Sequence, residues 1–158
     1  MQSSRKIQIG VIGGRNVSDH HLKQAEAVGK LLAEKGAVVV CGGLGGVMEA
    51  ACWGAKSANG TTVGILPTGK AADANPFVDI VIPTDLGVAR NALVVNASQG
   101  VIAVGGSYGT LSEIAFALQR GIPVASIGSW DVDTSVFQSE GPADAVSYIF
   151  NQISKLSE

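Results

Sequence analysis

The sequence predicts an α/β protein built as a single-domain, doubly wound parallel sheet with helices on both faces. Short runs rich in Val and Ile alternate with longer segments of helical periodicity along the whole chain. The short runs are apolar at consecutive positions, which is typical of strands covered on both faces. The length of 158 residues suits one such domain, and no linker divides the chain. We therefore expect residues 1–158 to form one domain, with residues 1–5 flexible.

Strands and helices are expected in alternating order. The strands cover residues 7–12, 37–41, 62–66, 80–82, 101–104 and 124–127, and the helices cover 19–35, 46–58, 87–98, 110–119 and 142–155. Ser18 suits a helix N-cap, Gly36 and Gly121 suit helix stops, and Pro142 suits a first helical turn. Segment 130–141 is interpreted as a surface excursion. Right-handed crossovers then give a Rossmann-like sheet, in which ligands bind beyond the carboxyl ends of the strands.

Twice an apolar strand ends in glycines that lead directly into a helix carrying a glutamate. Glycines lack a Cβ atom, so backbone N–H groups can approach a ligand, and the first turn of the following helix has unpaired N–H donors. Both features favour an anion, and their occurrence twice at one sheet edge predicts a phosphate-bearing ligand. The residues assigned to this site are Gly42, Gly43, Gly45, Gly46, Gly105, Gly106, Ser107, Tyr108, Gly109 and Thr110.

Other candidate groups follow the first and third strands at the same edge. Gly13 and Gly14 open the backbone after the first strand, and Arg15 either pairs with phosphate or is an ordinary surface arginine. Lys70 follows the third strand and is a candidate charge partner. The polar segment 71–76 after it is either a lid over the ligand or a plain surface loop.

Arg90 and Asn91 begin an otherwise apolar helix after the fourth strand. A charged side chain at such a position needs a partner, and Glu113 or a bound anion would supply it. Glu113 lies near the start of its own helix among apolar neighbours. It is either a ligand-facing carboxylate or a helix-start acid that forms a capping box with Thr110.

Charge and hydropathy exclude several classes of function. The net charge is −2, and the 11 Lys and Arg residues are scattered, so no nucleic-acid surface is expected. No apolar run reaches the roughly 18 residues of a membrane helix, which predicts a soluble cytoplasmic protein without a membrane partner. Cys41 and Cys52 are interpreted as reduced core thiols, His20 and His21 as solvated residues, and no protein-ligated metal is expected.

Only 15% of the residues are charged, below the roughly 25% usual for soluble domains. A monomer would therefore expose a large apolar surface. We expect a homo-oligomer, a dimer or a tetramer, with the helix face at 89–97 in its interface.

Three segments together resemble a known superfamily. They are Gly105 to Glu113, Gly42 to Glu49 and Gly87 to Asn91, and they look like the lysine-decarboxylase-like, or LOG-like, superfamily over nearly the whole chain. One branch of that superfamily contains cytokinin-activating phosphoribohydrolases, which cleave the N-glycosidic bond of nucleoside 5'-monophosphates. The other branch contains proteins similar to the molybdenum cofactor carrier, which binds this phosphorylated pterin. Lysine decarboxylase activity is excluded on chemistry, because no lysine has a setting suited to a pyridoxal phosphate Schiff base.

Departures from the hydrolase pattern favour the carrier-like branch. The hydrolase motif reads Pro-Gly-Gly-x-Gly-Thr-x-x-Glu, whereas this chain has Gly105, Gly106 and Ser107 at the first three positions. The hydrolases also have Arg followed by Lys where this chain has Arg90 and Asn91. The resemblance thus implies a non-enzymatic carrier of the molybdenum cofactor (molybdopterin), with molybdoenzymes or cofactor-synthesis proteins as partners.

Two alternatives stay open at this point. The first is a phosphoribohydrolase that acts on an AMP-like nucleotide with Glu113 and Arg90 as catalytic residues. The second is a nucleotide-binding sensor or structural oligomer without catalysis.

Overall fold

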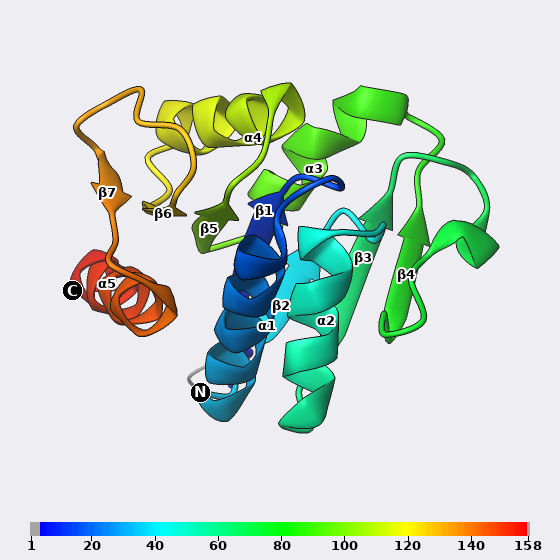
Figure 1. Cartoon of the computed structure of the whole chain (residues 1–158), viewed down its shortest axis with the longest axis horizontal. Coiled ribbons are helices and arrows are strands. Elements are labelled where there is room, and N and C mark those ends of the chain that lie inside the picture. Colours follow the sequence, from blue (N-terminus) through cyan, green and yellow to red (C-terminus); the bar gives the residue numbers. More distant parts are fainter. Residues whose placement is uncertain (1–3, 158) are drawn as a thin grey trace.

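The computed structural model describes residues 4–157, and its seven strands form one sheet in the order β4-β3-β2-β1-β5-β6-β7 (Figure 1). Every neighbouring pair of strands is parallel. The strands are β1 Gln8–Gly13, β2 Val38–Cys41, β3 Thr62–Leu66, β4 Ile80–Pro83, β5 Gly100–Val104, β6 Val124–Ile127 and β7 Val136–Gln138. The predicted α/β class and the Rossmann-like parallel sheet are confirmed. Of the segment expected to be flexible, residues 1–3 lie outside the described range.

Helices cover both faces of the sheet. The α-helices are α1 Asp19–Glu34, α2 Val47–Ser57, α3 Arg90–Asn96, α4 Tyr108–Gln119 and α5 Pro142–Leu156, with short 3-10 turns η1 Ala71–Asp73 and η2 Gly87–Ala89. Figure 1 shows α1 and α2 side by side in front of the sheet, with α3 and α4 behind its upper edge. The core has a cluster on each side. One joins the sheet to α1, α2 and α5 through residues such as Val28, Ala51 and Ile149, and the other joins it to α3 and α4 through Val94 and Ile114.

The helix boundaries follow local signals. Ser18 caps α1 by accepting a hydrogen bond from the backbone N–H of His21 over 3.2 Å, as its position predicted. Gly36 and Gly121 have φ of 77° and 69°, so both adopt the left-handed conformation that ends a helix. Pro142 is the first residue of α5.

Three sequence-based boundaries were wrong. The excursion at 130–141 contains the edge strand β7, which pairs with β6 in parallel. The helix expected at 87–98 is divided into η2 and a shorter α3. Helix α4 begins at Tyr108, two residues before the expected start.

The strand order fixes the position of a crevice. From β1 the chain builds outward through β2, β3 and β4, and then returns to place β5 on the other side of β1. The loops that leave β1 and β5 therefore turn to opposite faces, which opens a crevice at the carboxyl ends of these two strands. Within the range 4–157, the helices are all too short or too polar to span a lipid bilayer.

Candidate functional site

A cavity of about 350 Å³ lies at this crevice. It is bounded by the loops after β1, β2 and β5 and by the start of α3. Of the residues predicted from the sequence, it gathers Gly13, Gly14, Arg15, Gly42, Arg90, Asn91, Ser107, Gly109, Thr110 and Glu113. Its remaining walls are mainly apolar and come from Val11, Ile12, Leu44, Met48, Pro67, Gly87 and Val88.

Other predicted residues lie beside this cleft. Gly106 lines an adjoining cavity with Gly14, Arg15 and Ser107, and Gly46 lines a groove beyond Arg15. Gly43, Gly45, Lys70, Gly105 and Tyr108 line neither the cleft nor these two neighbours. Lys70 is exposed at the start of η1, and the Tyr108 side chain is 81% exposed and stacks on Trp130.

The second glycine loop leaves the start of α4 open toward the cleft. Ser107 occupies the N-cap position and its side chain makes no capping hydrogen bond. The backbone N–H groups of the first turn, from Tyr108 to Thr110, cannot find partners within the helix. They form the kind of N-terminal donor set that binds anions.

Backbone conformation and close contacts require glycine at two positions of this loop. Gly105 and Gly106 have φ of 54° and 104°, a region that favours glycine. A Cβ on Gly105 would lie 2.8 Å from Nδ1 of His21, and a Cβ on Gly106 would collide with Oγ1 of Thr110. His21 is thus half-buried against the loop, and its interpretation as a solvated residue was wrong.

Trp130 supports the same loop from the segment interpreted as a surface excursion. Its indole Nε1 donates to the carbonyl oxygen of Ser107 over 2.9 Å. The sequence carried no signal for this contact beyond the presence of a tryptophan in a polar segment.

In the first glycine loop, backbone N–H groups already donate hydrogen bonds within the protein. The N–H of Val47 donates to the carbonyl oxygen of Gly14 over 3.1 Å, and the N–H of Gly43 donates to Sγ of Cys41 over 3.3 Å. A Cβ on Gly46 would collide with the carbonyl of Gly14. The two loops looked equivalent in the sequence, but the loop at α4 has the more accessible donors.

Arg90 is the central cation of the cleft and is only 8% exposed. Its Nη1 donates to Oδ1 of Asn91 over 3.0 Å, while its buried Nε has no hydrogen-bond partner among the described residues. A Cβ on Gly42 would lie 2.5 Å from Nη1, so the guanidinium packs directly on the backbone of the first glycine loop. Burial lowers the pKa of Arg90, although the nearby Glu113 opposes this shift.

Asn91 connects Arg90 to the second loop. Its Nδ2 donates to Oγ of Ser112 over 3.1 Å, and that hydroxyl donates to the carbonyl oxygen of Gly109 over 2.6 Å. Ser112 was not predicted as a site residue, since a serine inside a helix gives no distinguishing signal.

Glu113 lies in the cleft wall and is 6% exposed. Burial raises its pKa to about 8, and the positive charge of Arg90 limits the rise. The carboxyl group is therefore mainly protonated at neutral pH, which makes it a hydrogen-bond donor as well as an acceptor.

For Glu113 the structure rules out one alternative in each of two open pairs, the capping box and the ion pair with Arg90. Because α4 begins at Tyr108, Thr110 is inside the helix and does not form a capping box with Glu113, which lies in the second turn. Among residues 4–157, the one ion pair joins Lys56 and Asp79. Arg90 and Glu113 therefore do not form a direct ion pair.

Segment 71–76, expected to be either a lid or a plain surface loop, is tied to the first glycine loop. The N–H of Asn75 donates to the carbonyl oxygen of Gly43 and its Nδ2 to that of Leu44, each over 2.9 Å. Residues Ala71–Asp73 form η1. Asn75 thus fixes one end of the segment.

Cys41 and Cys52 are both buried and free, as expected for core thiols, with their Sγ atoms 3.5 Å apart. The hydrogen bond between them lowers the pKa of Cys41 and raises that of Cys52. No cluster of three or more His, Cys, Asp or Glu side chains suited to a metal is found within residues 4–157.

The fold and the cleft define a Rossmann-like protein whose candidate ligand site, the cleft, lies at the switch point of a parallel sheet. More specifically, the chain belongs to the SLOG cluster4 family, which its residues 6–156 match. An uncharacterized protein of Archaeoglobus fulgidus is 49% identical over 142 residues, covering 90% of this chain and 93% of that protein.

Solved structures identify the branch of the LOG-like superfamily. The molybdenum cofactor binding protein of Rippkaea orientalis superposes with a TM-score of 0.90 at 39% identity, covering 96% of this chain and 99% of that one. The molybdenum cofactor carrier protein of Chlamydomonas reinhardtii gives a TM-score of 0.86 at 33% identity, covering 95% and 99%. The chain therefore falls in the branch similar to molybdenum cofactor carriers, as its glycine loops indicated.

Proposed function

We propose that this protein binds the molybdenum cofactor and carries it without chemical change. The observation that carries the proposal is the buried guanidinium of Arg90, whose Nε lacks a partner, in the same cleft as the uncapped first turn of α4. A buried cation with unused donors next to a helix N-terminus is suited to a phosphate group. The similarity to cofactor-binding proteins over almost the whole chain supports the pterin as the remainder of the ligand.

The phosphate would accept hydrogen bonds from the backbone between Ser107 and Thr110 and would pair with Arg90. Arg15, at the mouth of the cleft, would supply a second positive charge, and Lys70 a third from the adjacent segment. Because Glu113 is mainly protonated at neutral pH, it places little negative charge against the anion. These residues can hold a ligand without any covalent step, and enclosure would protect an oxidation-sensitive pterin from solvent.

One observation favours phosphoribohydrolase activity as a second candidate. A carboxyl group with a pKa of about 8 in a ligand cleft can act as a general acid, and Glu113 has that property. In this alternative, Glu113 would assist N-glycosidic cleavage of an AMP-like nucleotide while Arg90 holds its phosphate.

A fluorescence titration with molybdenum cofactor tests the carrier proposal. We expect saturable binding at micromolar cofactor, with loss of about tenfold or more in affinity for Arg90→Ala, since one charge-assisted contact is worth roughly 1.5–3 kcal/mol. Arg120→Ala is the matched control, because Arg120 is exposed at the other end of α4. Absence of saturable binding by the unmodified protein would exclude the carrier function.

The hydrolase candidate is tested separately with AMP and N6-modified AMP. Release of the free base faster than in buffer, and its loss in Glu113→Ala, would establish it. If base release equals that in buffer, only the binding function remains.

A further inference from the structure

A second cavity, of about 560 Å³, adjoins the phosphate cleft and lies between the N-terminal halves of α1 and α2. We name it the α1–α2 groove. Its side chains of interest are Arg15, Lys23, Glu26, Glu49, Trp53 and Phe77. None of these except Arg15 was assigned to a site by the sequence. A volume of this size is in the range of pockets that hold small organic ligands.

Two glycines bring the helices together beside the groove. A Cβ on Gly29 of α1 would collide with the carbonyl of Ala51, and a Cβ on Gly54 of α2 would collide with that of Glu26. The helix backbones are therefore in direct contact at this level. The groove runs along this contact, since Glu26 and Trp53 line it, and extends to Arg15, which also bounds the phosphate cleft.

An aromatic wall forms one side of the groove. Trp53 is 47% exposed, and its ring lies 5.0 Å from the ring of Phe77, measured between centroids, at an interplanar angle of 52°. A large aromatic side chain left half-exposed beside a cavity offers a flat ring a surface on which to stack. The side chain thus has a ligand-facing area that its packing within the protein does not use.

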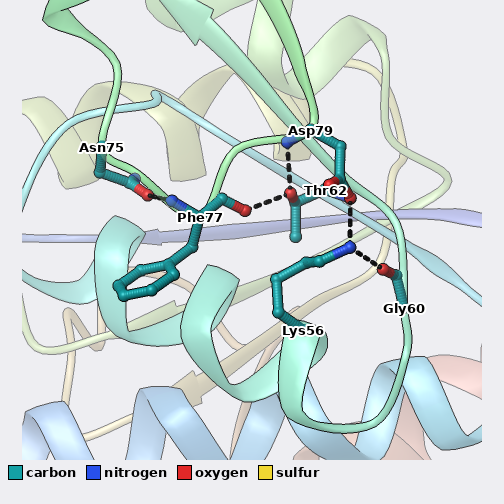
Figure 2. Close-up of polar contacts among 6 residues, drawn as sticks. All are labelled: Lys56, Gly60, Thr62, Asn75, Phe77 and Asp79. Atoms are coloured by element: carbon teal, nitrogen blue, oxygen red, sulfur yellow. Dashed lines mark hydrogen bonds and ion pairs between the residues drawn. The ribbon is translucent and has the colours of Figure 1, made fainter.

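Hydrogen bonds hold both the N–H and the carbonyl group of Phe77 (Figure 2). Its N–H donates to Oδ1 of Asn75 over 3.0 Å, and its carbonyl oxygen accepts from Oγ1 of Thr62 over 2.6 Å. The N–H of Asp79 donates to the same Thr62 hydroxyl over 2.8 Å, and Asp79 pairs with Lys56 over 2.9 Å. The wall is therefore preorganised, which reduces the entropy lost when a ring binds to it.

The polar groups of the groove match one kind of ring edge. We propose that the α1–α2 groove binds a planar ring with a 2-amino-4-oxopyrimidine edge, as in a pterin. The ring stacks on Trp53, its 2-amino and N3–H groups donate to the carboxylate of Glu49 or Glu26, and its 4-oxo oxygen accepts from Lys23 or Arg15. Adenine lacks the paired donors that a carboxylate binds in this way, so the groove discriminates against it.

This inference rests on the proposed function, because it locates the ring of a ligand whose phosphate lies in the neighbouring cleft. Arg15 connects the two cavities and can contact both parts of one ligand. The phosphate and the ring therefore have separate sets of contacts, which can be removed independently.

The test compares molybdenum cofactor binding and inorganic pyrophosphate binding, each measured by calorimetry, in a set of single variants. Trp53→Leu and Glu49→Gln should each weaken cofactor binding about tenfold and leave pyrophosphate binding unchanged. Glu26→Gln is compared with Glu34→Gln, which makes the same change at the far end of α1. Only Glu26→Gln is expected to weaken cofactor binding, because the carboxylates of Glu26 and Glu49 share the contact with the ring. Circular dichroism confirms that each variant is folded.

Guanosine and adenosine monophosphate serve as matched probes, since both carry ribose phosphate and differ in the base. Guanine shares the 2-amino-4-oxo edge, so GMP should bind about tenfold more tightly than AMP, and Glu49→Gln together with Glu26→Gln should remove that preference. Equal affinities would overturn the edge assignment.

The outcomes separate this inference from the proposed function. If the unmodified protein binds the cofactor and Trp53→Leu binds it equally well, the ring lies elsewhere while the carrier function stands. If the unmodified protein does not bind the cofactor at all, both fail.

Discussion

Asn91 holds the guanidinium of Arg90 in the cleft by accepting a hydrogen bond from Nη1 over 3.0 Å, while both side chains are 8% exposed. The same amide donates to Ser112 and so ties Arg90 to the start of α4. A lysine, which the hydrolases have at this position, has no acceptor and could not do this. Replacement of that lysine by asparagine therefore converts a second cation into a positioning group.

This relationship predicts that Asn91→Ala weakens phosphate-ligand binding about tenfold, because Arg90 loses the acceptor that orients it. It should also lower the free energy of unfolding by roughly 1–3 kcal/mol, since buried donors are left unpaired. Calorimetry and urea denaturation measure the two effects. Asn96→Ala, at the exposed end of the same helix, should change neither.

Gly42→Ala tests the packing of Arg90 on the first glycine loop. The new Cβ would lie 2.5 Å from Nη1 of Arg90 and 2.7 Å from Sδ of Met48. Both atoms are at the ends of flexible side chains, so the fold should survive while the guanidinium moves. We expect a loss of affinity of about tenfold or more, with the free energy of unfolding lowered by about 1–3 kcal/mol.

Gly141→Ala is the control for this variant, because a Cβ there meets no atom within 4 Å and lies far from the cleft in sequence. Wild-type affinity in Gly42→Ala would show that Arg90 tolerates displacement and that its packing on Gly42 is unimportant for binding.

Much of the fold was predictable because its strands are apolar on both faces and are separated by clear helix signals. Strand β3 was predicted at its observed bounds, Thr62–Leu66. Strand β7 was missed because it has three residues, one of them an exposed glutamine, within a polar segment. Such a short edge strand depends on pairing with β6, which the sequence does not display.

The candidate site was predictable only in outline. Parallel topology brings the glycine loops to one edge, so their proximity followed from the strand pattern. The contact of Trp130 with Ser107, and that of Trp53 with Phe77, join residues 23 and 24 positions apart and depend on loop conformations that no local pattern specifies. The hydrogen bond from the N–H of Val47 to the carbonyl oxygen of Gly14 could not be predicted for the same reason.

The raised pKa of Glu113 predicts a pH-dependent stability. The ordinary value is 4.5 and the folded value is about 8, so between these values the native state binds the proton more strongly than the unfolded chain does. The free energy of unfolding should therefore fall as pH rises from 4.5 to 8, and the loss should be complete above 8. At ~1.4 kcal/mol per pKa unit, the total change from this residue is a few kcal/mol.

Urea denaturation of the wild type and Glu113→Gln between pH 5 and pH 9 isolates this effect. The glutamine variant cannot ionise at this position. As pH rises, its free energy of unfolding should therefore increase relative to that of the wild type. A difference that stays constant over this range would mean that Glu113 has an ordinary pKa in the folded protein.

Exposed apolar side chains offer candidate contacts for the expected homo-oligomer. Large exposed apolar side chains lie on edge strand β4, in and directly before turn η2, and on helices α3 and α4. They are Ile80 at 51%, Ile82 at 42%, Leu86 at 53%, Val88 at 86%, Leu93 at 36% and Phe116 at 40% exposed. Leu93 lies within the predicted interface at 89–97, while the other residues extend it to neighbouring elements. An apolar surface of this kind is typical of a protein contact.

We predict that light scattering gives a multiple of the 16.0 kDa chain mass at micromolar concentration. Phe116→Glu should shift the protein to the monomer, because a carboxylate buried without a partner in an apolar interface costs several kcal/mol. Val132→Glu places the same charge at a side chain that is 50% exposed in the loop before β7 and should leave the mass unchanged. A monomer mass for the unmodified protein would contradict the prediction and leave these apolar residues to another partner.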